Sequence, residues 1–153
     1  MNILLDTNIL VFISRSKNFD DLLNFINPLD SSIYISIVTE AEIRSLAIRK
    51  RWSDKRNSLL ENFLENINIV DIGRQFINSY ANIDAYSQRN SLNFQDYPFA
   101  TPRNMGKNDL WIASVSALMN LTLVTTDSDF DHLDGGGFEV RKIDAKDFLP
   151  FIK

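Results

Sequence analysis

One stretch of this 153-residue chain, residues 106–130 (GKNDLWIASVSALMNLTLVTTDSDF), constrains the fold more than any other. Its residues 109–119 carry apolar side chains at the spacing of a helix that faces a protein core. Asn120 can end that helix, and residues 121–124 form a short apolar run that is typical of a buried strand. A polar sequence, TTDSD, then indicates a loop. A helix that leads almost directly into a buried strand is half of a β-α-β unit, and it predicts a parallel sheet.

The rest of the chain repeats this alternation of strands and helices. Neither a Pro/Gly/Ser-rich linker nor an internal repeat divides it, so we expect one domain over residues 1–153 with an α/β fold. The predicted strands are residues 2–5, 33–38, 69–72, 121–124 and 138–143. The predicted helices are residues 7–14, 19–26, 39–50, 53–67, 74–90 and 109–119.

Composition excludes several classes of site. The chain has no cysteine, which rules out a disulfide framework and a thiolate zinc site, and its only histidine is His132. The net charge of −4 lacks the basic excess that is common in proteins that bind nucleic acids. Its apolar runs are far shorter than the ~18 residues of a membrane span, and the N-terminus does not resemble a secretory signal. We therefore expect a cytoplasmic protein with no membrane span.

Acidic side chains follow the predicted strands or open the helices after them. They are Asp6, Glu42, Asp109 and Asp127, with Asp129 close behind. In a parallel sheet these positions face one crevice, so we expect the first four to converge there. Each also has a local explanation, because Asp caps helices and Thr39 with Glu42 fits a capping box.

Four carboxylates in one crevice predict a bound cation. Like charges at ~4–6 Å raise one another's pKa and oppose folding unless something neutralises them. Oxygen ligands without histidine or cysteine favour Mg²⁺ or Mn²⁺, and such an ion can activate water and stabilise a phosphate leaving group. The chain contains neither a G-x-x-x-x-G-K-[ST] loop nor a G-x-G-x-x-G motif, and Asn8 stands where a haloacid-dehalogenase-like phosphatase needs a second Asp.

Four blocks of sequence carry a resemblance to a known family. They are LLDTNIL, SIVTEAEIRSLA, NDLWIASVSA and LVTTDSDF, in this order along the chain. Together they resemble PIN-domain ribonucleases, and most closely the VapC-type toxins of bacterial toxin–antitoxin pairs. The resemblance covers essentially the whole chain. It implies a PIN-like three-layer α/β/α sandwich with a central, mainly parallel sheet of about five strands.

The same resemblance implies an activity and its residues. The family cleaves RNA internally with Mg²⁺ or Mn²⁺, and its toxins are inhibited by a cognate antitoxin and tend to form homodimers. The implied catalytic residues are Asp6, Glu42, Asp109 and Asp127, and the implied metal ligands are Asp6, Asp109 and Asp127. The implied supporting residues are Asn8, Thr125 and Asp129.

Basic residues in two segments are candidates for contact with RNA. They are Arg44, Arg49, Lys50 and Arg51 in a basic run that continues to Lys55 and Arg56, and Arg103 and Lys107 in the segment 93–107. That segment also contains the aromatic residues Phe94, Tyr97 and Phe99, which could stack on bases at ~1–3 kcal/mol each. The competing interpretation is a solvated helix surface for the basic run and simple packing for the loop.

Other functions fit parts of the same pattern. A PIN nuclease with a housekeeping role and no antitoxin would share all four acids, and a non-catalytic PIN-like module that binds RNA or protein would be expected to lose them. A metal-dependent phosphomonoesterase could use the same scaffold. In a toxin, an arginine of the antitoxin would compete for the acidic site. The apolar stripe of Leu59, Leu60, Phe63 and Leu64 would either receive an antitoxin helix or belong to the core.

Overall fold

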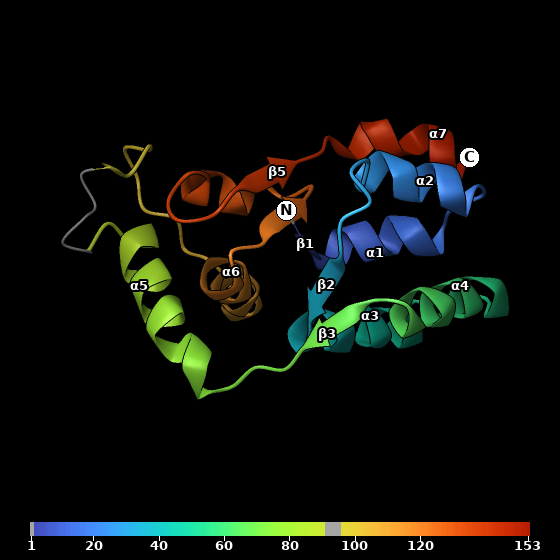
Figure 1. Cartoon of the computed structure of the whole chain (residues 1–153), viewed down its shortest axis with the longest axis horizontal. Helices are drawn as coiled ribbons and strands as arrows, with labels where there is room; N and C mark the ends of the chain where they lie inside the picture. The colour runs from blue at the N-terminus through green and yellow to red at the C-terminus, as the bar shows by residue number, and fades with distance from the viewer. Residues whose placement is uncertain (1, 91–95) are drawn as a thin grey trace.

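A five-stranded sheet forms the centre of the protein (Figure 1). The computed structural model describes residues 2–90 and 96–153. The strands are β1 (Ile3–Leu5), β2 (Ile33–Ser36), β3 (Asn68–Val70), β4 (Thr122–Thr125) and β5 (Val140–Lys142). Their order is β3-β2-β1-β4-β5, and every neighbouring pair is parallel. The predicted parallel sheet of about five strands is confirmed.

Helices cover both faces of this sheet. The α-helices are α1 (Thr7–Ser14), α2 (Phe19–Ile26), α3 (Ile37–Arg49), α4 (Asp54–Glu65), α5 (Ile77–Ser87), α6 (Lys107–Met119) and α7 (Leu149–Ile152). The 3-10 helices are η1 (Arg74–Phe76), η3 (Ser128–Leu133) and η4 (Ala145–Phe148). The predicted three-layer α/β/α sandwich is confirmed.

Two hydrophobic cores lie on opposite faces of the sheet, and β1 contributes to both. Side chains alternate along a strand, so Ile3 and Leu5 enter one core while Leu4 enters the other. The first core joins the sheet to α1, α2, α3 and α4, and the second joins it to α5, α6 and η3. Because β1 is central and fully buried, Asp6, which follows it, stands at a rigid position.

Helix α6 is anchored along almost its whole length. Five consecutive residues, 112–116, are buried, and Leu110 is 2% exposed. The helix ends at Asn120, whose φ of 52° is left-handed, a conformation that Asn tolerates better than most residues do. Asp109 therefore lies in the first turn of a helix that packing prevents from shifting.

The start of α3 corrects the prediction from sequence. Residues Ile37 and Val38 were expected in the strand and Thr39 was expected as the helix cap. Instead the strand ends at Ser36, whose hydroxyl accepts a hydrogen bond from the backbone N–H of Val38 at 3.1 Å. Thr39 is fully buried inside the helix, and its hydroxyl has no hydrogen-bond partner among the described residues. The predicted capping box of Thr39 and Glu42 is therefore wrong.

The apolar stripe of α4 faces its own core. Leu60, Phe63 and Leu64 are 2%, 3% and 6% exposed and belong to the core that contains α1 and α2. Only Leu59 of the stripe is half-buried. The interpretation as core packing is confirmed for these three residues, and they are not available to an antitoxin helix. Ser53 caps α4 as predicted, by accepting a hydrogen bond from the N–H of Arg56.

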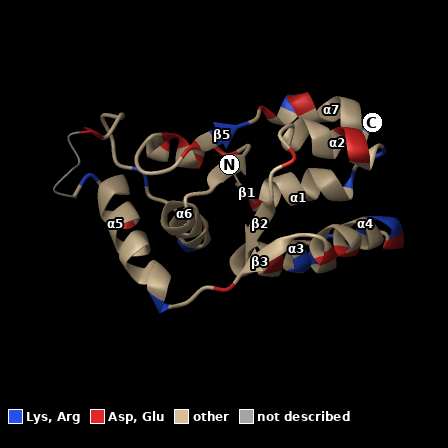
Figure 2. Cartoon of the chain, viewed as in Figure 1, with Lys and Arg blue, Asp and Glu red and all other residues tan. Residues whose placement is uncertain are grey.

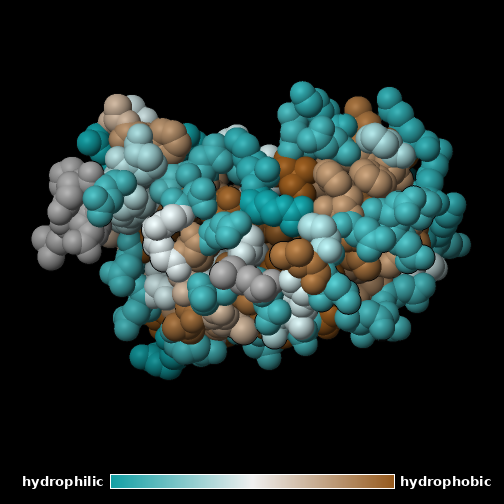
Figure 3. Space-filling model, turned by 45° about the horizontal axis from the view of Figure 1, so that its top comes forward, coloured by the Kyte–Doolittle hydropathy of each residue, from teal (hydrophilic) through white to brown (hydrophobic). Residues whose placement is uncertain are grey.

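The outer surface is predominantly polar. Charged residues of both signs alternate along α3 and α4 (Figure 2). On the face shown in Figure 3, hydrophobic residues form separate patches within a hydrophilic surface. Within the described residues, the structure contains no helix of the length and hydrophobicity that crossing a membrane requires.

The corrected start of α3 predicts opposite effects of two substitutions. Ser36→Ala should lower the free energy of unfolding by about 1 kcal/mol, because it removes the helix cap. Thr39→Val should leave that free energy unchanged or raise it, because it replaces a buried hydroxyl without a partner by a methyl group. Urea unfolding followed by tryptophan fluorescence measures both, and a larger loss for Thr39→Val would restore Thr39 as the cap.

Candidate active site

Thr125 connects two of the predicted acids at the carboxyl edge of the sheet. Its hydroxyl donates a hydrogen bond to Asp6 Oδ2 at 2.7 Å and accepts one from the backbone N–H of Asp127 at 2.9 Å. The other oxygen of Asp6, Oδ1, accepts from the backbone N–H of Thr7 at 2.7 Å. Asp6 is 5% exposed, so its carboxyl is held at a fixed place beneath the surface.

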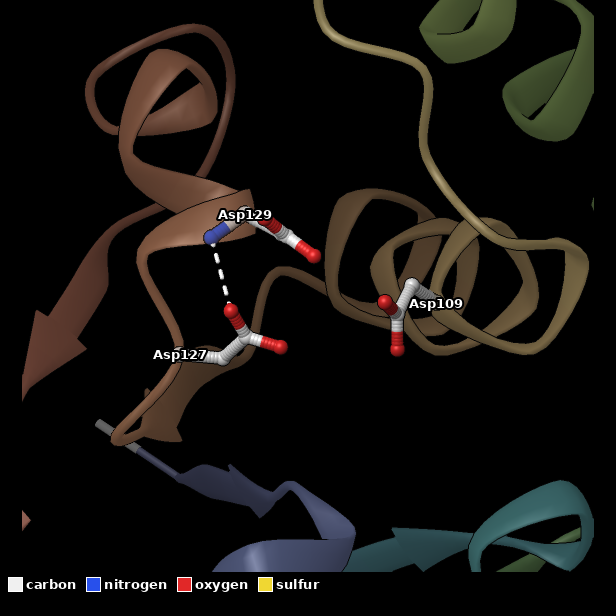
Figure 4. A group of neighbouring side chains, drawn as sticks. All are labelled: Asp109, Asp127 and Asp129. Atoms are coloured by element: carbon white, nitrogen blue, oxygen red, sulfur yellow. Dashed lines mark hydrogen bonds between the residues drawn. The ribbon is translucent and has the colours of Figure 1, made fainter.

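Three further carboxylates converge beside it (Figure 4). Asp109 reaches from the first turn of α6 toward Asp127 and Asp129, which lie where β4 leads into η3. One carboxylate oxygen from each of these three residues lies within 4.8 Å of the others. Asp127 Oδ1 accepts a hydrogen bond from the backbone N–H of Asp129 at 2.9 Å, and this contact holds the turn.

Glu42 approaches the site from α3. Its Oε1 accepts a hydrogen bond from the hydroxyl of Thr7 at 2.9 Å, so it bonds across the fold instead of capping its own helix. Sequence reasoning missed this contact of Thr7, because the only indication in the sequence is that Thr7 directly follows Asp6. Asn8, a predicted supporting residue, is exposed on α1, and its side chain forms no hydrogen bond with another described residue.

The electrostatics show that negative charge here is uncompensated. Burial raises the pKa of Asp109 to about 7, and the charges of Asp6, Asp127, Glu42 and Asp129 add to the increase. Burial also raises the pKa of Asp6 to about 6, although its hydrogen bonds from Thr125 and Thr7 act in the opposite direction. The site therefore favours any species that brings positive charge to it.

The donor set fits a small divalent cation. Mg²⁺ binds oxygen ligands at about 2.1 Å in an octahedron, so opposite ligands are about 4.2 Å apart. Oxygens within 4.8 Å of one another reach that arrangement with small side-chain rotations. The three-residue group contains Asp109 and Asp127, two of the predicted ligands, but its third member is Asp129 and not Asp6.

An open hollow of about 550 Å³ leads away from the acids along α3. Thr7, Glu42 and Asn108 line its end near the carboxylates, and Arg49 lines it further along α3. The side chains that α3 contributes recur at helical spacing, so one face of that helix forms the wall. A chain with negative charges could lie in this hollow between the acidic site and Arg49.

The other predicted RNA-binding residues differ in their environments. Arg44 is paired with Glu40 at 2.8 Å and also with Glu61, whose hydrogen bond is the main cause that raises the pKa of Arg44. Its guanidinium is thus already engaged by two carboxylates. Lys50 and Arg51 are exposed where α3 ends, and Lys107 is exposed at the start of α6.

The segment before α6 packs mainly on the protein itself. Tyr97 is 8% exposed, and its ring lies 5.3 Å from that of Tyr86 and 5.6 Å from that of His132. Arg103 lies over the ring of Phe99 at 4.5 Å. These contacts favour the packing interpretation for Tyr97 and Phe99, while Phe94 lies outside the described residues.

Comparisons with known proteins identify the family of this chain. The model of the family described as PIN domain matches residues 3–136. No curated protein sequence matches significantly.

Solved structures of toxin–antitoxin complexes contain similar chains. One is the VapBC2 complex of Rickettsia felis bound to a promoter DNA fragment, with 24% identity, 93% of this chain and 98% of that chain covered, and a TM-score of 0.67. Another is VapBC-1 of nontypeable Haemophilus influenzae, with 22% identity, the same coverage and a TM-score of 0.66. A toxin–antitoxin complex from Klebsiella pneumoniae gives 20% identity, 92% and 99% coverage and a TM-score of 0.62. At these identities the likeness establishes the fold.

The raised pKa values predict how stability depends on pH in the absence of metal. Between the unfolded pKa of 3.8 and the folded pKa of about 7, the folded protein binds more protons at Asp109 than the unfolded chain does. The free energy of unfolding should therefore fall as pH rises from about 4 to about 7. Asp109→Asn should reduce this dependence and raise that free energy by about 1–3 kcal/mol at pH 8.

Urea titrations in EDTA at pH 4 and pH 8 measure the effect. Asp20→Asn, which removes an exposed carboxylate from the first turn of α2, is the matched control, and at pH 8 it should lower the free energy of unfolding slightly, by less than about 1 kcal/mol, instead of raising it. Equal stabilities of the Asp109→Asn and wild-type proteins at pH 8 would show that the acids do not repel one another.

Proposed function

Because the chain belongs to the PIN domain family, whose members are generally nucleases, we propose that it is a metal-dependent RNA endonuclease and the toxin of a toxin–antitoxin pair. The observation that carries the proposal is the approach of Asp109, Asp127 and Asp129 within 4.8 Å, beside the buried Asp6. No cation of the described residues forms an ion pair with these acids, so their charge is available to a ligand.

Asp109, Asp127 and Asp129 would hold Mg²⁺ or Mn²⁺, with Asp6 behind them as a further ligand reached directly or through water. When bound, the ion lowers the pKa of water and stabilises the leaving oxygen of a phosphodiester. Thr125 fixes the position of Asp6 relative to Asp127, because its hydroxyl forms a hydrogen bond with each residue. Glu42 and Thr7 form the wall next to the reacting phosphate and orient each other.

The substrate would enter through the hollow along α3. Arg49 stands at the far end of the wall that Glu42 and Thr7 begin, so it would contact a phosphate beside the cleaved one. Among the basic residues, Arg44 is the least supported as a contact for RNA, because Glu40 and Glu61 already neutralise its charge. A single strand of RNA fits an open hollow of this kind better than a duplex does, because its backbone can bend to follow the wall.

An antitoxin would block the same acids. The similar solved chains come from VapBC and other toxin–antitoxin complexes, which supports a protein partner of that kind. An arginine of the antitoxin would pair with Asp109 and Asp127, because its planar fork binds carboxylates in a bidentate manner. The functional unit would contain two copies of this chain, as the resemblance to VapC-type toxins implies.

A housekeeping PIN nuclease is the main alternative, and the acids do not distinguish it from a toxin. A non-catalytic module is disfavoured because Asp6, Asp109, Asp127 and Glu42 are all present and close to one another. A phosphomonoesterase would cleave a small phosphate ester such as p-nitrophenyl phosphate. The open hollow beside the acids favours a polymer as the substrate.

The cleavage test compares two substitutions at the acids. Asp109→Asn should abolish metal-dependent cleavage of single-stranded RNA, and Glu42→Gln should reduce it by roughly 10–100-fold, as for a residue that supports ligands without binding the ion. Asp20→Asn is the surface control and should cleave normally. Wild-type rates of RNA cleavage by purified Asp109→Asn would refute the proposed site, and cleavage of p-nitrophenyl phosphate but not RNA would establish the phosphomonoesterase.

The toxin assignment has its own test. Expression of the wild-type chain should stop growth of a bacterial host, and Asp6→Asn should not. Co-expression of a small protein encoded beside this chain should restore growth, and the two proteins should co-purify. If cleavage is observed but neither co-purification nor rescue occurs, the protein is a PIN nuclease without an antitoxin.

A further inference from the structure

A second hollow lies at the opposite end of α1 from the acidic site. It has a volume of about 240 Å³ and lies between the end of α1 and the first turn of α4. Four cationic side chains line it, namely Arg15, Lys17, Lys55 and Arg56. Figure 2 shows Lys and Arg at this end of the molecule, with acidic segments beside them, where α1 and α4 lie side by side.

These cations have no carboxylate partners among the described residues. None of the four forms an ion pair within 4.0 Å. The adjacent acid, Asp54, lines a different hollow together with Asn57 and Glu61. Burial and then the charge of Arg15 lower the pKa of Arg56, which shows that the cations repel one another.

Arg56 is positioned by its neighbours instead of by an acid. Its guanidinium lies 3.8 Å from the centre of the Trp52 ring, and one Nη donates to the hydroxyl of Ser14 at 2.9 Å. Its Nε–H is buried and has no hydrogen-bond partner among the described residues. An Arg that is fixed in place with a free donor is prepared for an acceptor from outside the chain.

Ser16 provides an independent sign of a missing ligand. It lines the hollow, is 5% exposed, and its hydroxyl has no hydrogen-bond partner among the described residues. Burying a hydroxyl without a partner is unfavourable, so such groups in folded proteins call for an explanation. An anion held by the four cations would supply the acceptor.

Partial charges of the helices do not cancel the cations. The C-terminal end of α1 brings a negative partial charge of about half an elementary charge, and the N-terminal end of α4 brings a positive one of similar size. Four formal positive charges remain, in a protein whose net charge is −4. The hollow therefore selects anions even though the whole molecule repels them.

We infer that this hollow binds a phosphate of an RNA strand whose cleaved bond lies at the acidic site. The inference rests on the proposed nuclease function. Helix α1 begins beside Asp6 and has eight residues, so the two sites are separated by ~12 Å along its axis. A strand of a few nucleotides spans that distance. The exposed Lys50 and Arg51 precede Trp52, on which Arg56 stacks, and extend the positive surface from the end of α3 to the hollow.

Binding of labelled single-stranded RNA in EDTA tests the inference, because the strand remains intact without metal. Lys17→Gln should weaken binding about fivefold at 0.1 M salt and decrease the slope of log K against log salt by about 0.7, the contribution of one phosphate contact. Arg74→Gln removes one exposed cation from η1, far along the chain from the hollow, and should change neither quantity.

Ser16→Ala gives a second readout that a structural role would not produce. It should leave the melting temperature unchanged or raise it, because it removes a hydroxyl without a partner, and it should still weaken RNA binding. A lower melting temperature with unchanged RNA affinity would overturn the inference.

Two further results separate this inference from the proposed function. Unchanged RNA affinity and salt slope in Lys17→Gln, with metal-dependent cleavage intact in the wild type, would refute the hollow and leave the nuclease standing. Absence of any RNA binding by the wild type in EDTA would refute the inference, and absence of metal-dependent cleavage by the wild type would refute the proposed function as well. Displacement of the RNA by polyglutamate as effectively as by unlabelled RNA would identify an acidic protein segment as the occupant and also overturn the inference.

Discussion

The hydroxyl of Thr125 is the contact on which the arrangement of the acids depends. It donates to the carboxyl that follows β1 and accepts from the backbone of the residue that opens the turn after β4. The bond to Asp6 exists only because β1 and β4 are neighbours with parallel register, whereas the bond from Asp127 is local to the turn. The order of the strands therefore fixes the position of Asp6 relative to Asp127, and the side chain of Thr125 connects the two residues.

This arrangement works against the stability of the free protein. Burial and the neighbouring acids raise the pKa values of Asp6 and Asp109. The fold tolerates these carboxyls because two extensive hydrophobic cores hold the strands and helices that carry them. The middle of helix α6 is buried, so repulsion cannot move Asp109 away. A site that resists relaxation is also one that needs little reorganisation when a cation binds.

Periodicity and turn chemistry allowed most of the fold to be predicted from sequence. The alternation of apolar runs and helical patterns indicated the parallel sheet, and residues 109–124 located its central unit correctly. The start of α3 was missed because Ile37 and Val38 continue the β-branched pattern of the strand, whereas the cap of Ser36 depends on a single hydroxyl.

The parts of the site that escaped prediction depend on contacts between distant residues. Glu42 bonds to Thr7 across 35 positions, and Arg44 bonds to Glu61 across 17, so no local pattern contains either pair. The convergence of Asp109 and Asp127 was accessible because both residues stand at element ends that a parallel sheet brings together. The basic hollow was not predicted for the same reason as the contact between Glu42 and Thr7, since α1 and α4 meet there only in the folded chain.

The central place of β1 also has a consequence for the order of events during translation. Asp6 leaves the ribosome well before its partner Thr125, because 119 positions separate the two residues along the chain. At about 5–20 residues synthesised per second, Thr125 emerges on the order of ten seconds after Asp6. Until β4 emerges, the sheet lacks the strand that carries Thr125 and Asp127, and the acids cannot assemble. A growing chain therefore lacks an assembled acidic site, and the site forms only when nearly the whole domain has been made.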